Sequence, residues 1–182
     1  MLLQHRCTQR HCRPCRIVGG IVLATLLQSI LRVRWRRPLC KKGVQGWRVL
    51  DVGQSTGGFS EVCLAAGAAE VVGVDVGHGQ LHPRLAAETR LRCIEGLNAR
   101  DLTLAAVGGR RFDLCVADLS FISLTLVLPA LTPLADRWLL LVKPQFELQA
   151  ADIGKGGLVQ DEACYPRVEA RLRSAAEQAG LR

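Results

Sequence analysis

The feature that most constrains the fold is a glycine-rich turn at the end of an apolar segment. Residues 48–58 read Arg-Val-Leu-Asp-Val-Gly-Gln-Ser-Thr-Gly-Gly, and an apolar helix pattern follows. A second apolar segment then ends on an acid, Asp75. Glycines let a backbone pass close to a ligand because no Cβ is in the way. An acid about 20 residues beyond such a turn can bind ribose hydroxyls. We therefore expect a site for a nucleoside-bearing cofactor.

The spacing of the glycines helps to choose the cofactor. Gly53, Gly57 and Gly58 do not form Gly-x-Gly-x-x-Gly, which disfavours a dinucleotide. The turn also lacks the Gly-Lys-Ser/Thr ending of a triphosphate-binding loop. Asp51, where the turn begins, would repel a pyrophosphate but would attract the amino group of a cationic cofactor. S-adenosylmethionine has that amino group, a sulfonium and a ribose, so we expect it to be the cofactor.

Two other interpretations of the turn stay open. It spells Gly-x-Ser-x-Gly around Ser55, the nucleophile elbow of serine hydrolases. A hydrolase triad needs a histidine on a later loop, but the histidines after Ser55 are His78 and His82, close behind it. The turn is also compatible with a purely structural role in packing a helix on a sheet. Both interpretations explain less of the sequence than a cofactor site.

From Arg48 onward, segments typical of strands and helices alternate, which predicts an α/β fold with a parallel sheet and helices on both faces. We expect strands near 48–52, 70–75, 91–95, 112–117 and 137–142. We expect helices near 57–66, 80–88, 123–135 and 161–179. Ligands of such sheets bind beyond the carboxyl ends of the strands. That edge would hold Gly53, Asp75, residues 95–101, Asp118 and Lys143.

Two residues at this edge have the character of catalytic groups. Asp118 and Lys143 each end an apolar strand, and a lysine there is costly unless it is paired or used. Held at a hydroxyl opposite Asp118, the Lys143 amine can take or steer a proton while the acid tunes it. The alternatives are a turn acid and a solvent-reaching lysine. Either Ser120 or Ser123 would cap the helix that follows.

Charge divides the chain into two parts. Residues 1–50 contain eleven Lys or Arg and no Asp or Glu, whereas residues 51–182 contain thirteen basic and sixteen acidic side chains. We expect a basic N-terminal arm at 1–47 with no assigned fold and a cofactor-binding domain at 48–182. A basic arm beside such a domain suggests a polyanionic partner, most simply RNA.

Cysteine usage favours a reducing compartment. The chain has eight cysteines, and some lie in predicted strands or helices, where free thiols pack as small apolar groups: Cys63, Cys93 and Cys115. Three others lie near His5 and His11 in the arm and are candidate zinc ligands: Cys7, Cys12 and Cys15. A zinc site needs two well-spaced ligand pairs, so unpaired thiols are the simpler interpretation, and we expect no metal.

An apolar run at 17–31, flanked by arginines, is short of the about 20 residues that a membrane span needs. We expect a helix packed on the domain or on a partner, no stable membrane insertion and a cytoplasmic protein. The alternative is organelle targeting or membrane association through residues 1–37.

Several longer motifs occur together from Arg48 to the end of the chain. They begin at Asp51 (Asp-Val-Gly-x-Ser-Thr-Gly-Gly-Phe), Val74, Asn98, Ala117 (Ala-Asp-Leu-Ser-Phe-Ile-Ser-Leu), Leu141 (Leu-Val-Lys-Pro-Gln-Phe-Glu) and Ile153. In this order they resemble the TlyA family, FtsJ-like ribosomal RNA 2′-O-methyltransferases that are often labelled haemolysin A.

The resemblance implies a Rossmann-like methyltransferase fold, S-adenosylmethionine as methyl donor, and a ribose 2′-hydroxyl of ribosomal RNA, free or in a ribosomal subunit, as acceptor. It implies that Asp118 and Lys143 belong to a Lys-Asp-Lys-Glu catalytic set. It places the following residues at the cofactor: Asp51, Gly53, Ser55, Gly57, Asp75, Asn98, Asp101 and Asp118.

The chain also departs from the family pattern. The family's N-terminal RNA-binding domain and the segment that supplies its first catalytic lysine do not match residues 1–47, although Lys41 and Lys42 are nearby. The catalytic glutamate belongs to strands beyond the final helix, so we expect a domain that lacks its closing strands. That loss would expose a sheet edge unless the arm packs there. A catalytically impaired cofactor- or RNA-binding remnant and a membrane-active haemolysin are the alternatives.

Overall fold

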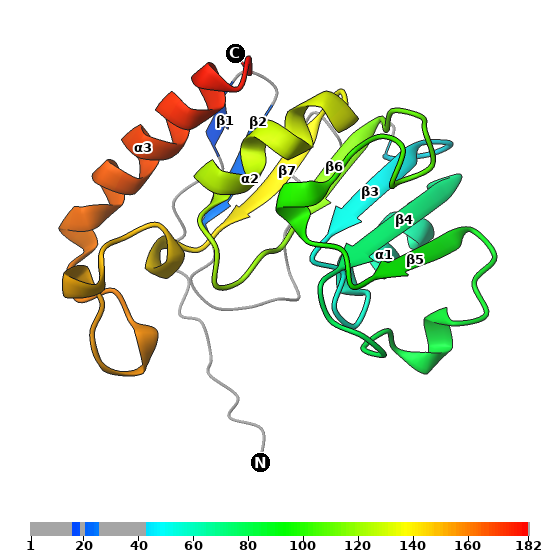
Figure 1. Cartoon of the computed structure of the whole chain (residues 1–182), viewed down its shortest axis with the longest axis horizontal. Coiled ribbons are helices and arrows are strands. Elements are labelled where there is room, and N and C mark those ends of the chain that lie inside the picture. Colours follow the sequence, from blue (N-terminus) through cyan, green and yellow to red (C-terminus); the bar gives the residue numbers. More distant parts are fainter. Residues whose placement is uncertain (1–15, 19–20, 26–42, 182) are drawn as a thin grey trace.

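The computed structural model describes residues 16–18, 21–25 and 43–181, and its centre is a seven-stranded sheet (Figure 1). The strands are β1 Arg16–Val18, β2 Ile21–Thr25, β3 Arg48–Val52, β4 Glu70–Asp75, β5 Leu91–Glu95, β6 Leu114–Ala117 and β7 Trp138–Val142. Their order across the sheet is β1-β2-β7-β6-β3-β4-β5. All neighbours are parallel except β1 and β2, which are antiparallel.

The central strands are buried along almost their whole length, which explains their unbroken apolar sequence. All four residues of β6 and all five of β7 are buried, and β3 is buried from Val49 to Val52. Strands of parallel sheets have this pattern because helices cover both faces. The five strands predicted beyond Arg48 are confirmed, although β6 and β7 begin slightly later than expected.

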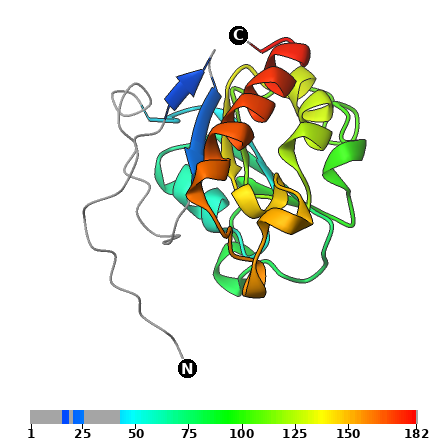
Figure 2. The ribbon, with the colours of Figure 1, turned by 90° about the vertical axis from the view of Figure 1, so that its left-hand side faces the viewer.

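Helices cover the two faces of the sheet (Figures 1 and 2). Helix α1, Gly58–Ala65, packs on one face with Val49, Val71 and Leu114. Helices α2, Leu124–Leu131, and α3, Tyr165–Gln178, contribute to the larger core on the other face. The sheet therefore separates two apolar cores, and loops at the ends of the strands are free to form a site.

One predicted helix is wrong and two are shorter than expected. Residues 80–88 form only a 3-10 turn at Pro83–Leu85, and Leu85 packs against Gly57 of the glycine-rich turn. A helix cannot run from 80 through Pro83, because proline disfavours helical backbone in the preceding residue, and His82 is extended. The helix predicted at 123–135 ends at Leu131, and a 3-10 turn containing Pro133 follows. Proline has no N–H to continue the helical hydrogen bonds. A 3-10 turn, Glu162–Cys164, likewise precedes α3.

The apolar run at 17–31 differs from expectation wherever the structure describes it. The backbone of Ile21–Thr25 forms β2, which pairs in parallel with β7 from Ile21–Trp138 to Thr25–Val142. Residues 21–25 of the arm thus lie along the β7 edge of the sheet, as in the alternative in which the arm packs on an exposed edge, and no helix is present at 21–25. None of the helices among the described residues is long and apolar enough to cross a membrane. The zinc candidates Cys7, Cys12 and Cys15 lie outside the described residues.

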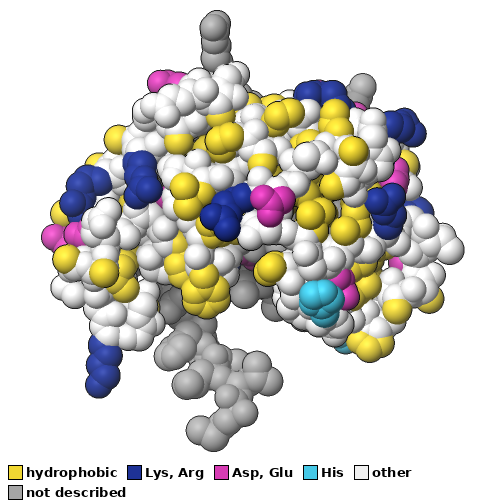
Figure 3. All heavy atoms as spheres, in the orientation of Figure 1, with side chains coloured by type: hydrophobic (Ala, Val, Ile, Leu, Met, Phe, Trp, Pro, Cys, Tyr) yellow, Lys and Arg dark blue, Asp and Glu magenta, His cyan; other side chains and the backbone are white. Residues whose placement is uncertain are grey.

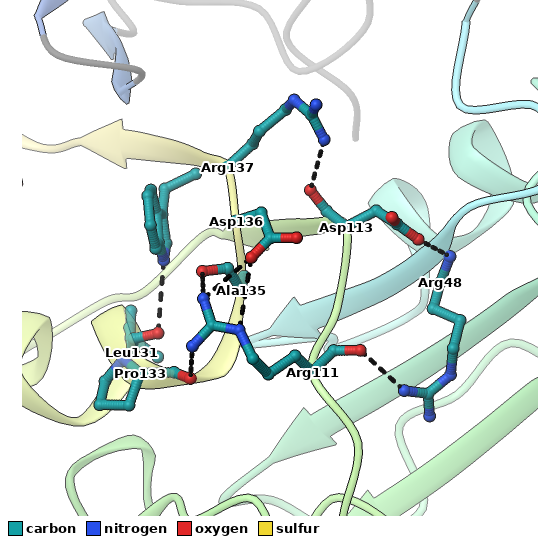
Figure 4. Close-up of polar contacts among 9 residues, drawn as sticks. Arg48, Arg111, Asp113, Leu131, Pro133, Ala135, Asp136 and Arg137 are labelled. Atoms are coloured by element: carbon teal, nitrogen blue, oxygen red, sulfur yellow. Dashed lines mark hydrogen bonds and ion pairs between the residues drawn. The ribbon is translucent and has the colours of Figure 1, made fainter.

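Arginines tie together the amino ends of β3, β6 and β7 (Figure 4). The backbone N–H of Arg48 donates to Asp113 Oδ2 at 2.8 Å, and its guanidinium donates to the carbonyl of Arg111 at 3.0 Å. The Arg111 guanidinium pairs with Asp136 at 2.9 Å and donates to the Ala135 carbonyl at 2.7 Å. These arginines are used for structure at the end of the sheet opposite the predicted site.

Candidate functional site

The glycine-rich turn lies at the carboxyl end of β3, where the chain must pass close to β6. Gly53 has φ +81°, and a Cβ built on it would lie 2.5 Å from the carbonyl oxygen of Asp118. Gly57 has φ +93°, and a Cβ there would overlap Leu85. Both positions therefore require glycine for conformation and for space. Ser55 also has positive φ, 47°, so the whole turn is held in an uncommon conformation.

We expect Gly53→Ala to destabilise the fold by more than a left-handed backbone alone explains. Gly46→Ala is the matched control, because Gly46 has a similar φ of +76° and open space around its Cβ position. The conformational cost common to both variants is about 1–2 kcal/mol. Thermal unfolding should show a larger loss in Gly53→Ala, since only that variant pushes β6 away from β3. Equal losses would contradict the close approach to Asp118.

Asp75 closes the turn from the end of the neighbouring strand β4. Its Oδ2 accepts a hydrogen bond from the Ser55 N–H at 2.7 Å, and its Oδ1 accepts from the Gly77 N–H at 2.8 Å. The Asp75 carbonyl accepts from the Leu97 N–H at 3.1 Å, which brings the next loop to the same edge. In that loop Asn98 caps the 3-10 turn Ala99–Asp101. The predicted ribose acid thus lies between the two loops expected to hold a nucleoside.

Asp51 lies behind the turn and is almost completely buried. Its Oδ2 accepts from the Ser60 hydroxyl at 2.7 Å, and the Gln54 amide donates to the Ser60 oxygen at 2.9 Å. The Cys93 thiol donates to Gln54 Oε1 at 2.8 Å. Asp51 Oδ1 has no hydrogen-bond partner among the described residues. The network therefore ends in a buried acceptor that a bound donor would satisfy.

Burial raises the pKa of Asp51 from 3.8 to about 6, although the hydrogen bond from Ser60 acts in the opposite direction. Because this pKa is higher in the folded state, the proton stabilises the fold at low pH. That contribution is complete below about pH 4 and is lost as pH rises through about 6.

Asp51→Asn should remove this pH dependence. Relative to the natural protein, the variant should gain up to about 3 kcal/mol of unfolding free energy between about pH 4 and pH 7. Urea denaturation of both proteins at a series of pH values measures that difference directly, since all other groups cancel. A difference that stays constant with pH would show that the pKa of Asp51 is not raised.

Asp118 and Lys143 form an ion pair between the ends of β6 and β7. The Lys143 ammonium lies 2.6 Å from Asp118 Oδ1 and donates a hydrogen bond to the Ser120 hydroxyl at 2.7 Å. About a quarter of each charged side chain is exposed, 21% for Lys143 and 27% for Asp118, so a substrate can reach the pair. The pair is also next to the glycine-rich turn, because the Asp118 carbonyl is the group that Gly53 approaches.

Two phenylalanines border this pair. Phe121 is 91% exposed and has φ 63°, an uncommon conformation that holds the aromatic ring in solvent. Its ring lies 5.2 Å from that of Phe146 on the neighbouring loop, measured between centroids. On the face shown in Figure 3, Lys and Arg side chains are spread over the surface and do not form one large basic patch. The exposed aromatic ring is therefore the more distinctive surface feature near the pair.

The structure brings most predicted residues to one edge of the sheet, but not all in the same way. Gly53, Ser55 and Asp75 form one group, and Asp118 and Lys143 form a second that touches it at Gly53. Asp51 supports the turn from inside, and Asp101 is exposed at the end of its 3-10 turn. Lys41 and Lys42 lie outside the described residues.

Sequence reasoning missed several partners and left one choice open. Ser123 is the cap of α2, whereas Ser120 contacts Lys143, so the two serines have different roles. The Gln54 network and the buried carboxylate of Glu147 were not predicted. No spacing rule reveals such contacts, because most of their partners are far apart in the sequence.

Comparison with known proteins places these features in a family. The model of the FtsJ-like methyltransferases matches residues 34–181. The 16S/23S rRNA (cytidine-2′-O)-methyltransferase TlyA of Mycobacterium tuberculosis is 50% identical over 140 residues, which are 75% of this chain and 52% of that protein. The chain spans about half the length of the curated relatives it matches.

Solved structures give the same fold. A candidate hemolysin from Streptococcus thermophilus is 36% identical with a TM-score of 0.71, covering 75% of this chain and 50% of that one. A second, from Lactococcus lactis, is 34% identical with a TM-score of 0.71, covering 75% of this chain and 67% of that one. The Rossmann-like methyltransferase fold predicted from the motifs is thereby confirmed.

Proposed function

Because the chain belongs to the FtsJ-like methyltransferase family, and within it to the TlyA or haemolysin A group, we propose that it methylates a ribose 2′-hydroxyl of ribosomal RNA. S-adenosylmethionine is the proposed methyl donor. The observation that carries the proposal is the Asp118–Lys143 ion pair, at 2.6 Å, directly beside the glycine-rich turn. The M. tuberculosis relative is named for the same reaction.

The residues at the turn fit this donor. Asp51 Oδ1 is a buried acceptor without a partner, as expected near the amino group of a cationic ligand. Each carboxylate oxygen of Asp75 accepts one backbone hydrogen bond and retains capacity to accept a ribose hydroxyl. Gly53 and Gly57 have no side chains that would obstruct a ligand at these two positions of the turn. We propose that these four residues, with Ser55, Asn98, Asp101 and the Asp118 backbone, hold the cofactor.

When bound, S-adenosylmethionine supplies an electrophilic methyl group on its sulfonium. The protein must hold the ribose oxygen and remove its proton as the carbon–oxygen bond forms. We propose that the Lys143 ammonium first loses a proton to solvent, that the neutral Nζ then accepts the proton of the hydroxyl, and that Asp118 stabilises the ammonium that forms again. Ser120 holds the amine in a fixed direction through its hydrogen bond. In this proposal Lys143 is the base, Asp118 stabilises its protonated form, and Ser120 orients its amine.

The proposed RNA partner is supported by charge and by Phe121. Residues 1–50 carry eleven basic and no acidic side chains, which suits contacts to phosphate. Exposed aromatic rings stack on unpaired bases, and Phe121 lies on the loop between Asp118 and α2. A ribosomal RNA segment, free or in a ribosomal subunit, would then place one ribose at Lys143.

The test combines binding with turnover on the full chain. Calorimetric titration with S-adenosylmethionine should show binding, and tritiated donor should label ribosomal subunits that lack the modification. Nuclease digestion should then release a 2′-O-methylated nucleoside. Label at a base would overturn the proposed acceptor. Binding without transfer would favour the non-catalytic remnant, and no binding by a folded sample would contradict the proposal as a whole.

A further inference from the structure

Glu147 is a buried carboxylate that joins the loops carrying the two proposed catalytic groups. Its side chain is only 3% exposed. Its Oε2 accepts a hydrogen bond from the Ser123 hydroxyl at 2.5 Å, and its Oε1 accepts from the Leu124 N–H at 2.7 Å. Glu147 follows the β7 end that carries Lys143, whereas Ser123 and Leu124 follow the β6 end that carries Asp118. The carboxylate therefore ties one loop to the other.

The two loops, 118–123 and 143–147, meet at three places. The Lys143 ammonium contacts Asp118 and Ser120, the rings of Phe121 and Phe146 pack together, and Glu147 binds the start of α2. The first two contacts are partly or largely exposed, so water competes with them. The Glu147 contacts are buried, and a carboxylate that accepts two short hydrogen bonds there is strongly oriented. Of the three contacts, the one made by Glu147 therefore holds the two loops together most firmly.

Helix α3 also restrains the backbone of Glu147. The Arg171 guanidinium, on α3, donates to the Glu147 carbonyl at 2.8 Å. The Glu147 N–H donates to the Pro144 carbonyl at 3.0 Å, which closes the 3-10 turn that starts directly after Lys143. The backbone of Glu147 is therefore held at both its N–H and its carbonyl. A displacement of its side chain would be transmitted to Lys143 through one short turn.

We propose that Glu147 is a positioning residue that holds Lys143 against Asp118 in the geometry that methyl transfer needs. This inference rests on the proposed function, because Lys143 needs to be positioned for catalysis only if the protein transfers a methyl group. A purely local role is the competing explanation, since an acid at a helix N-terminus stabilises the helix. The two explanations differ in what happens at Lys143 when the helix remains folded.

The first measurement reports on Lys143 without any reaction. The chain has four lysines, Lys41, Lys42, Lys143 and Lys155, so lysine labelled with ¹³C at Cε gives few NMR signals. Lys143→Arg identifies the relevant signal. We expect Glu147→Ala to change the chemical shift of the Lys143 signal, because the ammonium should move relative to Asp118. The control is Leu131→Val, which weakens the other end of α2 at a residue that is 0% exposed and belongs to the larger core.

The second measurement is the rate of methyl transfer to ribosomal subunits. Glu147→Ala should lower kcat by about 10- to 100-fold, because a small misplacement of a catalytic group costs that much. The KM for S-adenosylmethionine should change little, since Glu147 contacts none of the proposed cofactor residues. Glu147→Gln, which keeps the shape and can still accept from Leu124, should recover most of kcat. Leu131→Val should retain kcat at a temperature where both proteins are folded.

The outcomes separate this inference from the proposed function. A moved Lys143 signal together with the kcat loss supports the positioning role. An unmoved signal, or a kcat equal to that of Leu131→Val, overturns it and leaves Glu147 as a helix cap. If Glu147→Ala does not fold, Glu147→Asp draws the carboxylate back by one methylene and is measured in the same way. If the natural protein transfers no methyl group, the proposed function fails while the NMR signal still decides whether Glu147 positions Lys143.

Discussion

Lys143→Ala should reduce methyl transfer to ribosomal RNA by at least about 100-fold, the usual contribution of a positioned proton acceptor. The variant should bind S-adenosylmethionine as tightly as the natural protein, because Lys143 contacts Asp118 and Ser120 and not the turn around Gly53. Transfer of tritiated methyl to ribosomal subunits measures the first effect, and calorimetric titration measures the second. A separation of turnover from binding is the signature of a catalytic group.

Two further variants sharpen that result. Lys143→Arg keeps the positive charge beside Asp118 but cannot release a proton in the physiological range, so it should also be inactive. Lys155→Ala is the matched control, because Lys155 is the other lysine of the described residues and is exposed in a loop. Its activity should stay close to that of the natural protein. An active Lys143→Arg would mean that the charge matters and that Lys143 is not the proton acceptor.

Asp75→Ala should weaken binding of S-adenosylmethionine by at least about 100-fold, because two hydrogen bonds to a charged acceptor are lost. The same change removes the acceptors of the Ser55 and Gly77 N–H groups, so the turn should lose its shape as well. Calorimetric titration measures the affinity, and circular dichroism confirms that the sheet remains folded.

A second variant at this position separates the two effects. Asp75→Asn retains one carbonyl acceptor for the turn but presents an amide where a ribose hydroxyl would donate. It should therefore lose less thermal stability than Asp75→Ala, because only one of the two backbone hydrogen bonds is lost, and still bind poorly. Asp136→Ala, at the opposite end of the sheet, is the control for loss of an acidic side chain. Unchanged affinity in both Asp75 variants would remove Asp75 from the cofactor site.

The sequence predicted the sheet well because its strands are continuous apolar runs, and β3 to β7 lie where they were expected. The helix predicted at 80–88 is wrong: only one 3-10 turn forms at Pro83–Leu85, and Pro83 keeps His82 before it in an extended conformation. The apolar run at 17–31 favours a helix, but in the structure residues 21–25 are a strand that pairs with β7. Strand pairing with a distant segment depends on an available sheet edge, which no local pattern reveals.

At the candidate site, too, some residues could be predicted from the sequence and others could not. Glycine spacing, the acids Asp51 and Asp75, and the pair Asp118 and Lys143 are visible in the sequence, because each belongs to a short motif with its own chemical logic. The roles of Gln54, Ser120 and Glu147 depend on partners that folding brings close: Ser60 and Cys93, Lys143, and the start of α2.

By itself, the sequence determined the α/β class, the glycine-rich turn and the identity of the proposed catalytic residues, since these follow from local composition and from motif order. Only the tertiary structure decided which groups meet. It placed Lys143 at 2.6 Å from Asp118, brought the Asp118 backbone to Gly53, and clamped both loops with Glu147. The physical reason is that the carboxyl ends of parallel strands converge at one edge of the sheet, and their separations there depend on packing across the whole domain.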